Sequence, residues 1–424
     1  MTHQEADGHD ERDGGRYSDR PGGRDAERQG PRRDGLTDVA GLRVGHARVA
    51  GPGALSGTTV VLAPEGGAVA AVDVRGGGPG TRETDALDPR NLVQRIEAVV
   101  LTGGSAYGLE SAAGVMAWLE EQGRGVRVGP DPSHVVPVVP AACVFDLGRG
   151  GDFGARPDAS TGRAAVEAAA ASELGAPVEC GAVGAGTGAV VGGMKGGVGT
   201  ASTVLASGIT VAALVVVNAV GSALDPVTGA LYGRYFEPSY GAGGVGGGGE
   251  GEGPLPPYVH LQQGLAHAPL TPGPLSADPL HPDPLYPDPA VHAAAMERLA
   301  RAAERNAPPP MNTTLAVVAT DADLTRAQAQ KLAGTAHDGI ARAIRPVHLL
   351  NDGDTVFALA TGARPLPAEG GPLAPNEILA AGADMVTRAI VRAVRAAEGV
   401  SGPGGEFPSH TELYGPEAAK KEEM

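Results

Sequence analysis

The chain of 424 residues has few aromatic residues and few cysteines, and it lacks any long apolar run. Aromatic residues make up 3% of the sequence, so the core must be built from alanine, valine, leucine and isoleucine. Two cysteines, Cys143 and Cys180, exclude a disulfide scaffold and a metal site made only of cysteine. No run of about 18 apolar residues is present, which excludes a transmembrane helix. The amino terminus is charged and has no apolar segment, so we expect no signal peptide.

Positive charge is also scarce. The chain carries 33 lysines and arginines against 49 acidic residues, which gives a net charge of −16. Nucleic-acid-binding proteins need a basic surface, and an anionic membrane would repel this charge. We therefore expect neither a nucleic acid nor a membrane as its partner. Together with the low cysteine content and the absence of a signal peptide or transmembrane helix, this favours a cytoplasmic protein.

Glycine and proline are abundant, with 67 and 36 residues, and they mark three segments that have few apolar side chains. Residues 1–35 are mostly Asp, Arg, Gly and Glu, so we expect a disordered tail. Residues 241–312 begin with a glycine run and continue with proline-rich sequence, which is typical of a linker, and only 290–306 looks helical. Residues 403–424 predict a second flexible tail. The two remaining segments, 36–240 and 313–402, should form two parts of one domain.

Both of these segments alternate between strand-like and helix-like patterns. Residues 58–62 and 68–74 are β-rich, and the turn Pro64-Glu65-Gly66-Gly67 between them predicts a hairpin. Thr325 and Gln328 form a capping box, which predicts a helix that extends to about Ile344. Further strands are expected at 98–101, 209–220, 313–319 and 354–360, and further helices at 105–122, at 162–175 and after a cap at Asn376. This alternation favours an α/β fold with helices layered on sheets.

Two glycine-rich stretches could suggest a nucleotide site. Residues 184–189 (GAGTGA) fit the pattern G-x-G-x-x-A, but a dinucleotide site also needs an acidic residue about 20 residues later. Residues 202–221 contain none. Lys195 lies among glycines, but no Ser or Thr follows it, so it does not form a phosphate-binding loop. A nucleotide-binding protein therefore remains an alternative that the sequence disfavours.

Ser105 follows two glycines and resembles a nucleophile elbow, but Tyr107 stands where G-x-S-x-G requires glycine. The ordinary interpretation is a helix cap, and such a residue can still line a pocket. The 11 histidines form no H-x-x-x-H pair and no cluster with cysteine. We expect no metal and no cofactor.

The junction of Asn312 and Thr313 joins the end of the linker to a strand that begins with a hydroxyl residue. Threonine often begins a strand, so the junction alone is a weak signal. If the Asn312–Thr313 bond is cut, Thr313 becomes a new amino terminus. Its hydroxyl is then a nucleophile, and its α-amine, with an ordinary pKa of about 7.7–8.0, is a base in the same residue.

Six short motifs make the chemistry specific when they are taken together. They are residues 36–46 (LTDVAGLRVGH), 75–83 (RGGGPGTRE), 101–109 (LTGGSAYGL), 194–199 (MKGGVG), 312–314 (NTT) and 351–354 (NDGD). In this order the chain resembles the L-aminopeptidase D-amidase/D-esterase (DmpA-like) peptidase family, over about residues 36–235 and 312–400. That family includes β-aminopeptidases and nylon-oligomer (6-aminohexanoate) endohydrolases.

The resemblance implies an αββα sandwich and an N-terminal-nucleophile hydrolase that cuts itself at Asn312–Thr313. It also implies that the two resulting chains stay together and assemble into tetramers. Lys195 matches the active-site lysine of the family, and Asn218 matches its catalytic asparagine. Asp352 and Asp354 match an aspartate pair of the nylon-oligomer branch. We expect substrate contacts from Ser105, Tyr107 and Phe145.

The chemistry of these residue types agrees with these roles. A lysine among glycines can approach the backbone, and its charge would keep the Thr313 amine neutral and basic. An asparagine amide can donate to an oxyanion, which Asn218 would do. Asp352 and Asp354, on a turn between layers, can hold Lys195 or Thr313 in place.

The sequence thus predicts a threonine hydrolase for amide or ester bonds of peptides, β-peptides or ω-amino-acid oligomers. An acyltransferase of the ornithine acetyltransferase type on the same fold is one alternative. An uncleaved, inactive scaffold is another.

Overall fold

The computed structural model describes residues 33–236, 286–306 and 311–415, and it contains two five-stranded sheets. The first sheet has the order β1-β2-β5-β8-β4. Its strands are β1 (Arg43–Arg48), β2 (Gly57–Leu62), β4 (Thr81–Arg82), β5 (Ala98–Thr102) and β8 (Ala141–Cys143).

The second sheet draws on all parts of the chain and has the order β11-β12-β13-β14-β3. Its strands are β3 (Val69–Val74), β11 (Val198–Val204), β12 (Thr210–Asn218), β13 (Thr313–Ala322) and β14 (Thr355–Arg364). Neighbours run antiparallel except β13 and β14, which are parallel. Residues on both sides of the predicted linker thus form one sheet.

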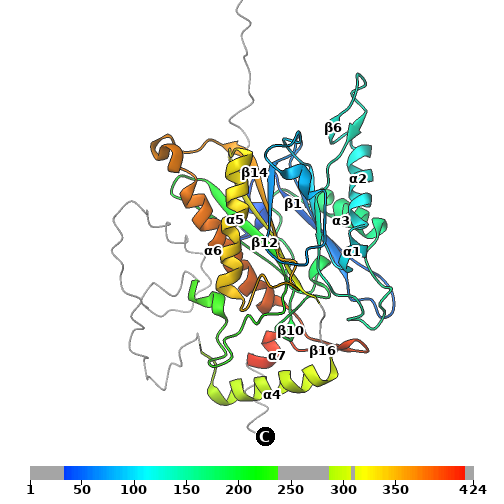
Figure 1. Ribbon diagram of the computed structural model, residues 1–424, viewed down its shortest axis with the longest axis vertical. Coiled ribbons are helices and arrows are strands. Elements are labelled where there is room, and N and C mark those ends of the chain that lie inside the picture. Colours follow the sequence, from blue (N-terminus) through cyan, green and yellow to red (C-terminus); the bar gives the residue numbers. More distant parts are fainter. Residues whose placement is uncertain (1–32, 237–285, 307–310, 416–424) are drawn as a thin grey trace, which may run out of the picture. The chain divides into compact units, whose positions relative to one another are not determined.

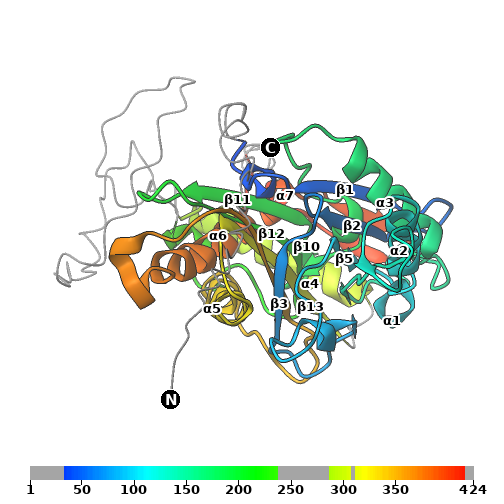
Figure 2. The ribbon, with the colours of Figure 1, turned by 90° about the horizontal axis from the view of Figure 1, so that it is seen from above.

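Helices cover the outer face of each sheet. The helices α2 (Ser111–Glu121) and α3 (Ala159–Ala171) pack on the first sheet, and α5 (Arg326–Ala343) and α6 (Asn376–Ala396) pack on the second. Figure 1 shows these two pairs on opposite sides of the strands, and the turned view in Figure 2 keeps the same grouping. The order of the layers is helix, sheet, sheet, helix, as the family resemblance implies.

Strand β12 shows how the layers share one core. All nine of its residues are buried, as expected for a central strand that is covered on both faces. Val211, Ala213, Val215 and Val217 belong to the cluster that α5 and α6 complete. Ala212, Leu214 and Val216 belong to the cluster between the sheets, which includes Leu101 and Phe357. The period of two in the sequence therefore separates two cores.

The remaining elements lie outside the two large sheets and their four covering helices. The helices are α1 (Ser105–Gly108), α4 (Pro289–Arg305) and α7 (His410–Tyr414), and the 3-10 turns lie at Leu36–Asp38, Thr84–Leu87, Gly184–Gly186, Tyr232–Phe236 and Ala368–Leu373. Three small ribbons pair β6 (Val126–Arg127) with β7 (Val135–Val136), β9 (Val190–Val191) with β10 (Met194–Lys195), and β15 (Val400–Gly402) with β16 (Gly405–Phe407). No helix within the described residues is long and apolar enough to cross a membrane.

The predicted hairpin between residues 58–62 and 68–74 is wrong. Strand β2 is paired on both edges, by β1 and β5, so β3 cannot join it and pairs with β14 in the other sheet. The turn at 64–67 therefore connects two layers. A local turn signal gives the reversal of the chain but not the identity of the partner strand.

Two predicted caps also differ from the structure. The helix expected at 105–122 is divided into α1 and α2, and the cap of α1 is Gly104, at φ +77°, instead of Ser105. Helix α6 has Asn376 as its first residue, and Pro375 is its cap. The capping box of Thr325 and Gln328 is confirmed, and the backbone N–H of Gln328 donates to the Thr325 hydroxyl at 3.3 Å.

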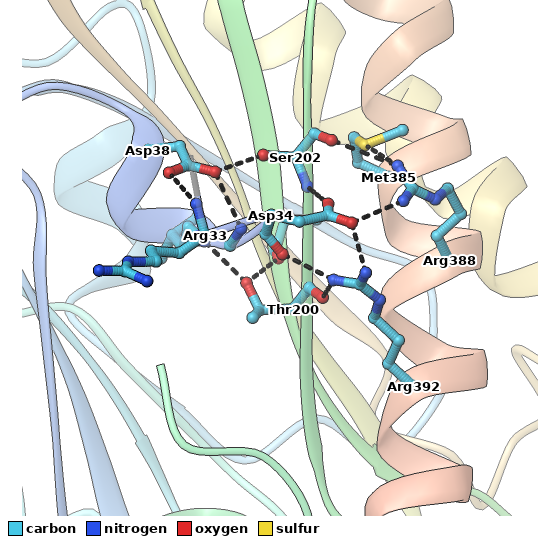
Figure 3. A network of polar contacts seen from close by, with 11 residues as sticks. Arg33, Asp34, Asp38, Thr200, Ser202, Met385, Arg388 and Arg392 are labelled. Atoms are coloured by element: carbon cyan, nitrogen blue, oxygen red, sulfur yellow. Dashed lines mark hydrogen bonds and ion pairs between the residues drawn. The ribbon is translucent and has the colours of Figure 1, made fainter. Parts of the chain in front are cut away.

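Asp34 lies inside the folded part, although the sequence predicts a disordered tail up to residue 35. Its carboxylate accepts a hydrogen bond from the Ser202 amide at 2.8 Å and pairs with Arg388 at 2.8 Å and with Arg392, as Figure 3 shows. The two arginines lie on α6, so this contact fixes the chain just before β1. Residues 1–32 of the predicted tail lie outside the described residues.

The predicted flexible segment after residue 402 is ordered in its first part. Residues 403–415 contain β16 and α7, and Phe407 and Leu413 are buried. The carbonyl of Pro408 accepts a hydrogen bond from the Lys195 amide at 2.9 Å, so this segment supports β10. Of the predicted linker, 241–285 and 307–310 lie outside the described residues, and the helix expected within it is α4.

Candidate active site

Three strand ends of the second sheet meet at one place. Asn218, the last residue of β12, is paired with Thr313, the first residue of β13. Because β13 and β14 are parallel, the segment before β14 lies beside the start of β13, and Asn312 forms a bridge with Asp352. The register therefore brings together residues that are about a hundred positions apart in the sequence.

The Asn312–Thr313 peptide is held between a hydroxyl and a backbone amide. The Thr313 hydroxyl donates to the Asn312 carbonyl oxygen at 2.7 Å, and the Gly353 N–H donates to the same oxygen at 3.0 Å. Both residues are buried. A Cβ atom on Gly353 would lie 2.6 Å from the Thr313 hydroxyl, so only glycine leaves the hydroxyl this position. The carbonyl is thus polarised next to a potential nucleophile.

Asp354 fixes the residue after Thr313. One oxygen of its carboxylate accepts the Thr314 N–H at 2.7 Å. The other accepts the His348 N–H at 3.0 Å and lies 2.8 Å from His348 Nδ1. This carboxylate connects the start of β13 to the loop before β14, and it thereby sets the position of Thr313.

The two carboxylate oxygens of Asp352 differ in their hydrogen bonds. Its Oδ2 accepts the Leu349 N–H at 2.9 Å, while its buried Oδ1 has no hydrogen-bond partner among the described residues. Burial raises the pKa of this carboxyl, and the nearby charge of Asp354 raises it further. Such a group can accept a proton or a hydrogen bond when a new donor, such as an amine, forms beside it.

Arg149 connects two of the predicted site residues and was not itself predicted. Its Nη1 donates to the Asn218 side-chain oxygen and, at 2.7 Å, to the Gly188 carbonyl. Its Nη2 donates to the Asn312 side-chain oxygen at 3.0 Å. Burial lowers the pKa of Arg149 to about 10, so the guanidinium is still a cation at neutral pH. Arg149 lies in the stretch FDLGRGG, and a basic residue among glycines was the signal that singled out Lys195.

Lys195 is fully buried at the end of β10. Its ammonium donates to the carbonyls of Gly186, Ala189 and Gly196 at 3.0, 2.9 and 2.8 Å. Burial lowers the pKa of Lys195 to about 7, and the charge of Arg149 acts in the same direction. Within the described residues its hydrogen bonds go to these carbonyls and not to Asp352 or Asp354.

The side-chain amide of Asn218 is oriented by two donors that bind its oxygen. The side-chain oxygen accepts from Arg149 and from the Val190 N–H, the latter at 3.1 Å. The side-chain nitrogen makes one long contact of 3.4 Å with the Phe145 carbonyl. The oxygen is thus firmly held, and the nitrogen is the loosely bound donor.

The predicted substrate contacts lie beside the first sheet, in α1 and just after β8. Ser105 has φ +51°, a conformation that costs a non-glycine residue energy, and its amide donates to the Val144 carbonyl at 3.0 Å. The next residue, Phe145, contacts Asn218 as described, so Ser105 and Phe145 lie near one edge of the site. Tyr107 is exposed, and the Arg156 guanidinium lies 3.7 Å from the centre of its ring. The structure gives Tyr107 no contact with Thr313.

Known proteins resemble this chain in sequence and in fold. The profile of peptidase family S58 matches residues 34–407. A protein named as an uncharacterised aminopeptidase of Mycobacterium bovis is 42% identical over 398 residues, which cover 89% of this chain and 97% of the relative. A 6-aminohexanoate-oligomer endohydrolase of a Kocuria species is 29% identical over 346 residues, with 79% and 77% covered.

Two solved structures share the fold. A β-aminopeptidase of a Burkholderia species aligns with a TM-score of 0.60 and 21% identity, over 92% of this chain and 94% of its own. An L-aminopeptidase D-Ala-esterase/amidase of Ochrobactrum anthropi, described as a variant of the Ntn hydrolase fold, aligns with a TM-score of 0.59 and 19% identity, over 92% and 95%. The predicted αββα sandwich of the N-terminal-nucleophile hydrolases is thus confirmed.

Proposed function

Because the chain belongs to peptidase family S58, and is therefore a hydrolase of the peptidase type, we propose that it is a self-processing enzyme whose nucleophile is Thr313. Its substrates would be amide or ester bonds of peptides, β-peptides or ω-amino-acid oligomers, a range that includes the bonds named for its relatives. The observation that carries the proposal is the Asn312 carbonyl, which the Thr313 hydroxyl and the Gly353 amide both contact.

Self-processing would begin at this carbonyl. The Thr313 oxygen attacks the Asn312 carbonyl carbon, the carbon–nitrogen bond breaks, and the hydroxyl proton passes to the Thr313 nitrogen. The Gly353 amide stabilises the negative charge that develops on the carbonyl oxygen. Water then hydrolyses the resulting ester, which releases the Asn312 carboxylate and leaves Thr313 with a free α-amine.

The same atoms would then act on a substrate. The Thr313 amine takes the proton of the hydroxyl, the oxygen attacks the acyl carbon, and the proton passes to the leaving amine. Water hydrolyses the acyl-enzyme to give the free acid. Asn218 would assist, because its loosely bound nitrogen can leave the long contact with Phe145 and donate to the oxyanion.

Two charged groups would tune the new amine. The ammonium of Lys195 disfavours protonation of a nearby amine, so it would keep the amine neutral and able to accept a proton. The free oxygen of Asp352 can accept a hydrogen bond from the amine and orient it. Asp354 would act less directly, as a positioning residue that holds Thr314 and thereby the start of β13.

Product analysis tests whether the acyl group goes to water. The cleaved protein is incubated with a small aminoacyl amide or ester, with and without ornithine as an acceptor. We expect the free amino acid as the product in both cases, at the same rate, because water is the acceptor in the proposed reaction. Acylated ornithine as the main product would contradict the hydrolase and identify an acyltransferase.

A further inference from the structure

The residue before the proposed cleavage point is recognised at three groups. The N–H of Asn312 donates to the Asn351 carbonyl at 3.1 Å, and its carbonyl accepts from Gly353 and Thr313. Its side-chain oxygen accepts from Arg149 Nη2 at 3.0 Å. Asn312 is only 2% exposed, so its departure would leave a pocket for one residue that these groups line.

A substrate has to enter this same pocket if the proposed function holds. Its acyl carbon must approach the Thr313 hydroxyl, and its carbonyl oxygen must approach the Gly353 amide, because these are the groups that act on the Asn312 carbonyl in self-processing. Asn312 must therefore leave after self-cleavage. An amino-terminal residue in its place would direct its amino group to the Asn351 carbonyl and its side chain to Arg149.

The free donor of Arg149 then determines which side chain fits. Nη1 is already used by Asn218 and Gly188, and Nη2 loses its acceptor when Asn312 leaves. A buried cationic donor that lacks an acceptor destabilises the complex, whereas a carbonyl or carboxylate oxygen restores the hydrogen bond. A leucyl side chain has nearly the same shape as an asparaginyl side chain but has no such oxygen.

We propose that this pocket is the acyl-side subsite, and that Arg149 makes it select amino-terminal residues with an oxygen on Cγ, asparaginyl and aspartyl above aliphatic ones. The proposal rests on the proposed function and goes beyond it, because it names the substrate class. It also assigns Arg149 two contacts, one with the substrate and one with Asn218.

The first test compares matched substrates on the wild-type enzyme. The 4-nitroanilides of asparagine and leucine are hydrolysed by protein that mass spectrometry has first shown to be cleaved. We expect kcat/KM to be about 10- to 100-fold higher for asparagine, the range of one hydrogen bond to a charged group. Equal values, or a preference for leucine, would overturn the subsite while the hydrolase itself would stand.

The second test assigns the selectivity to Arg149. Arg149→Lys keeps the charge but not the planar fork, so it cannot hold Asn218 and the substrate with the same geometry. The asparagine-to-leucine ratio should fall to about threefold or less, since the hydrogen bond is lost. Arg388→Lys is the matched control. Arg388 is about as buried as Arg149, with an exposed fraction of 7% against 9%, but it lies on α6 in the contact with Asp34. Its ratio should stay that of the wild type.

Self-cleavage provides a third comparison that does not depend on turnover by the variant. Asn312→Leu removes the same oxygen from the chain itself, so the appearance of the two chains should slow in the same direction. If Arg149→Lys fails to fold, the self-cleavage rate of Asn312→Leu and the asparagine-to-leucine ratio of the wild type still test the subsite. A wild-type ratio that persists in Arg149→Lys, or unchanged cleavage of Asn312→Leu, would contradict the role of Arg149. A wild-type protein that is uncleaved and inactive would refute the proposed function, and the subsite with it.

Discussion

Replacement of Thr313 by alanine is expected to give a single uncleaved chain that does not hydrolyse amides or esters. The variant lacks the oxygen that contacts the Asn312 carbonyl at 2.7 Å, and no other hydroxyl among the described residues contacts that carbonyl. Loss of a nucleophile lowers turnover by roughly 10³-fold or more. Intact mass and the release of 4-nitroaniline measure the two effects.

Two further variants make this result specific. Thr313→Ser retains the hydroxyl and the future amine, so it should retain part of both cleavage and turnover. Thr314→Ala is the matched control on the next residue. The buried Thr314 hydroxyl has no hydrogen-bond partner among the described residues, and its N–H, which Asp354 binds, is kept. This control should be cleaved and active. A fully active Thr313→Ala enzyme would refute the assignment of the nucleophile.

Replacement of Lys195 by alanine is expected to move the pH dependence of catalysis without removing the nucleophile. In the wild type, kcat/KM should rise with pH through a group that titrates near neutrality, because the Thr313 amine must be unprotonated. A nearby positive charge lowers the pKa of that amine, so its removal raises the pKa. The rising limb should therefore move to higher pH. On its acidic side, kcat/KM should fall about tenfold if the pKa of the amine rises by about 1.

The charge of Lys195 itself determines the pH range in which the wild type and the variant differ most. Burial lowers the pKa of Lys195 to about 7, so its charge is present below that pH and fades above it. The wild type and the variant should consequently differ most on the acidic side. Lys331→Ala, an exposed lysine on α5, is the control and should leave the profile unchanged. An unmoved limb in Lys195→Ala would reject the tuning role.

The parts of the fold that depend on local pattern could be predicted from the sequence. The alternation in β12, the capping box at Thr325 and the strand that begins at Thr313 each follow from neighbouring residues. Partner choice could not be predicted, and β3 shows why. Its sequence and the turn before it are compatible with a hairpin, but β2 has no free edge, and that fact depends on β1 and β5.

The site residues likewise divide into those that the sequence indicated and those that depend on distant partners. Family motifs indicated Lys195, Asn218, Asp352 and Asp354, and the strand register explains how Asn218 and Asp352 come to lie beside the Asn312–Thr313 junction. Arg149 was missed, since its partners Asn218 and Asn312 are distant in the sequence and its own loop looks like other glycine-rich loops. Asp34 was missed for the same reason, because its arginines lie on α6 near the other end of the chain.

The central claim is that Thr313 becomes an amino terminus, and the intact mass of the purified wild-type protein tests it most directly. The account predicts two chains, the larger ending at Asn312 and the smaller beginning at Thr313, with masses that add up to the full chain plus one water. A single full-length species that hydrolyses no amide or ester would contradict both the processing and the mechanism.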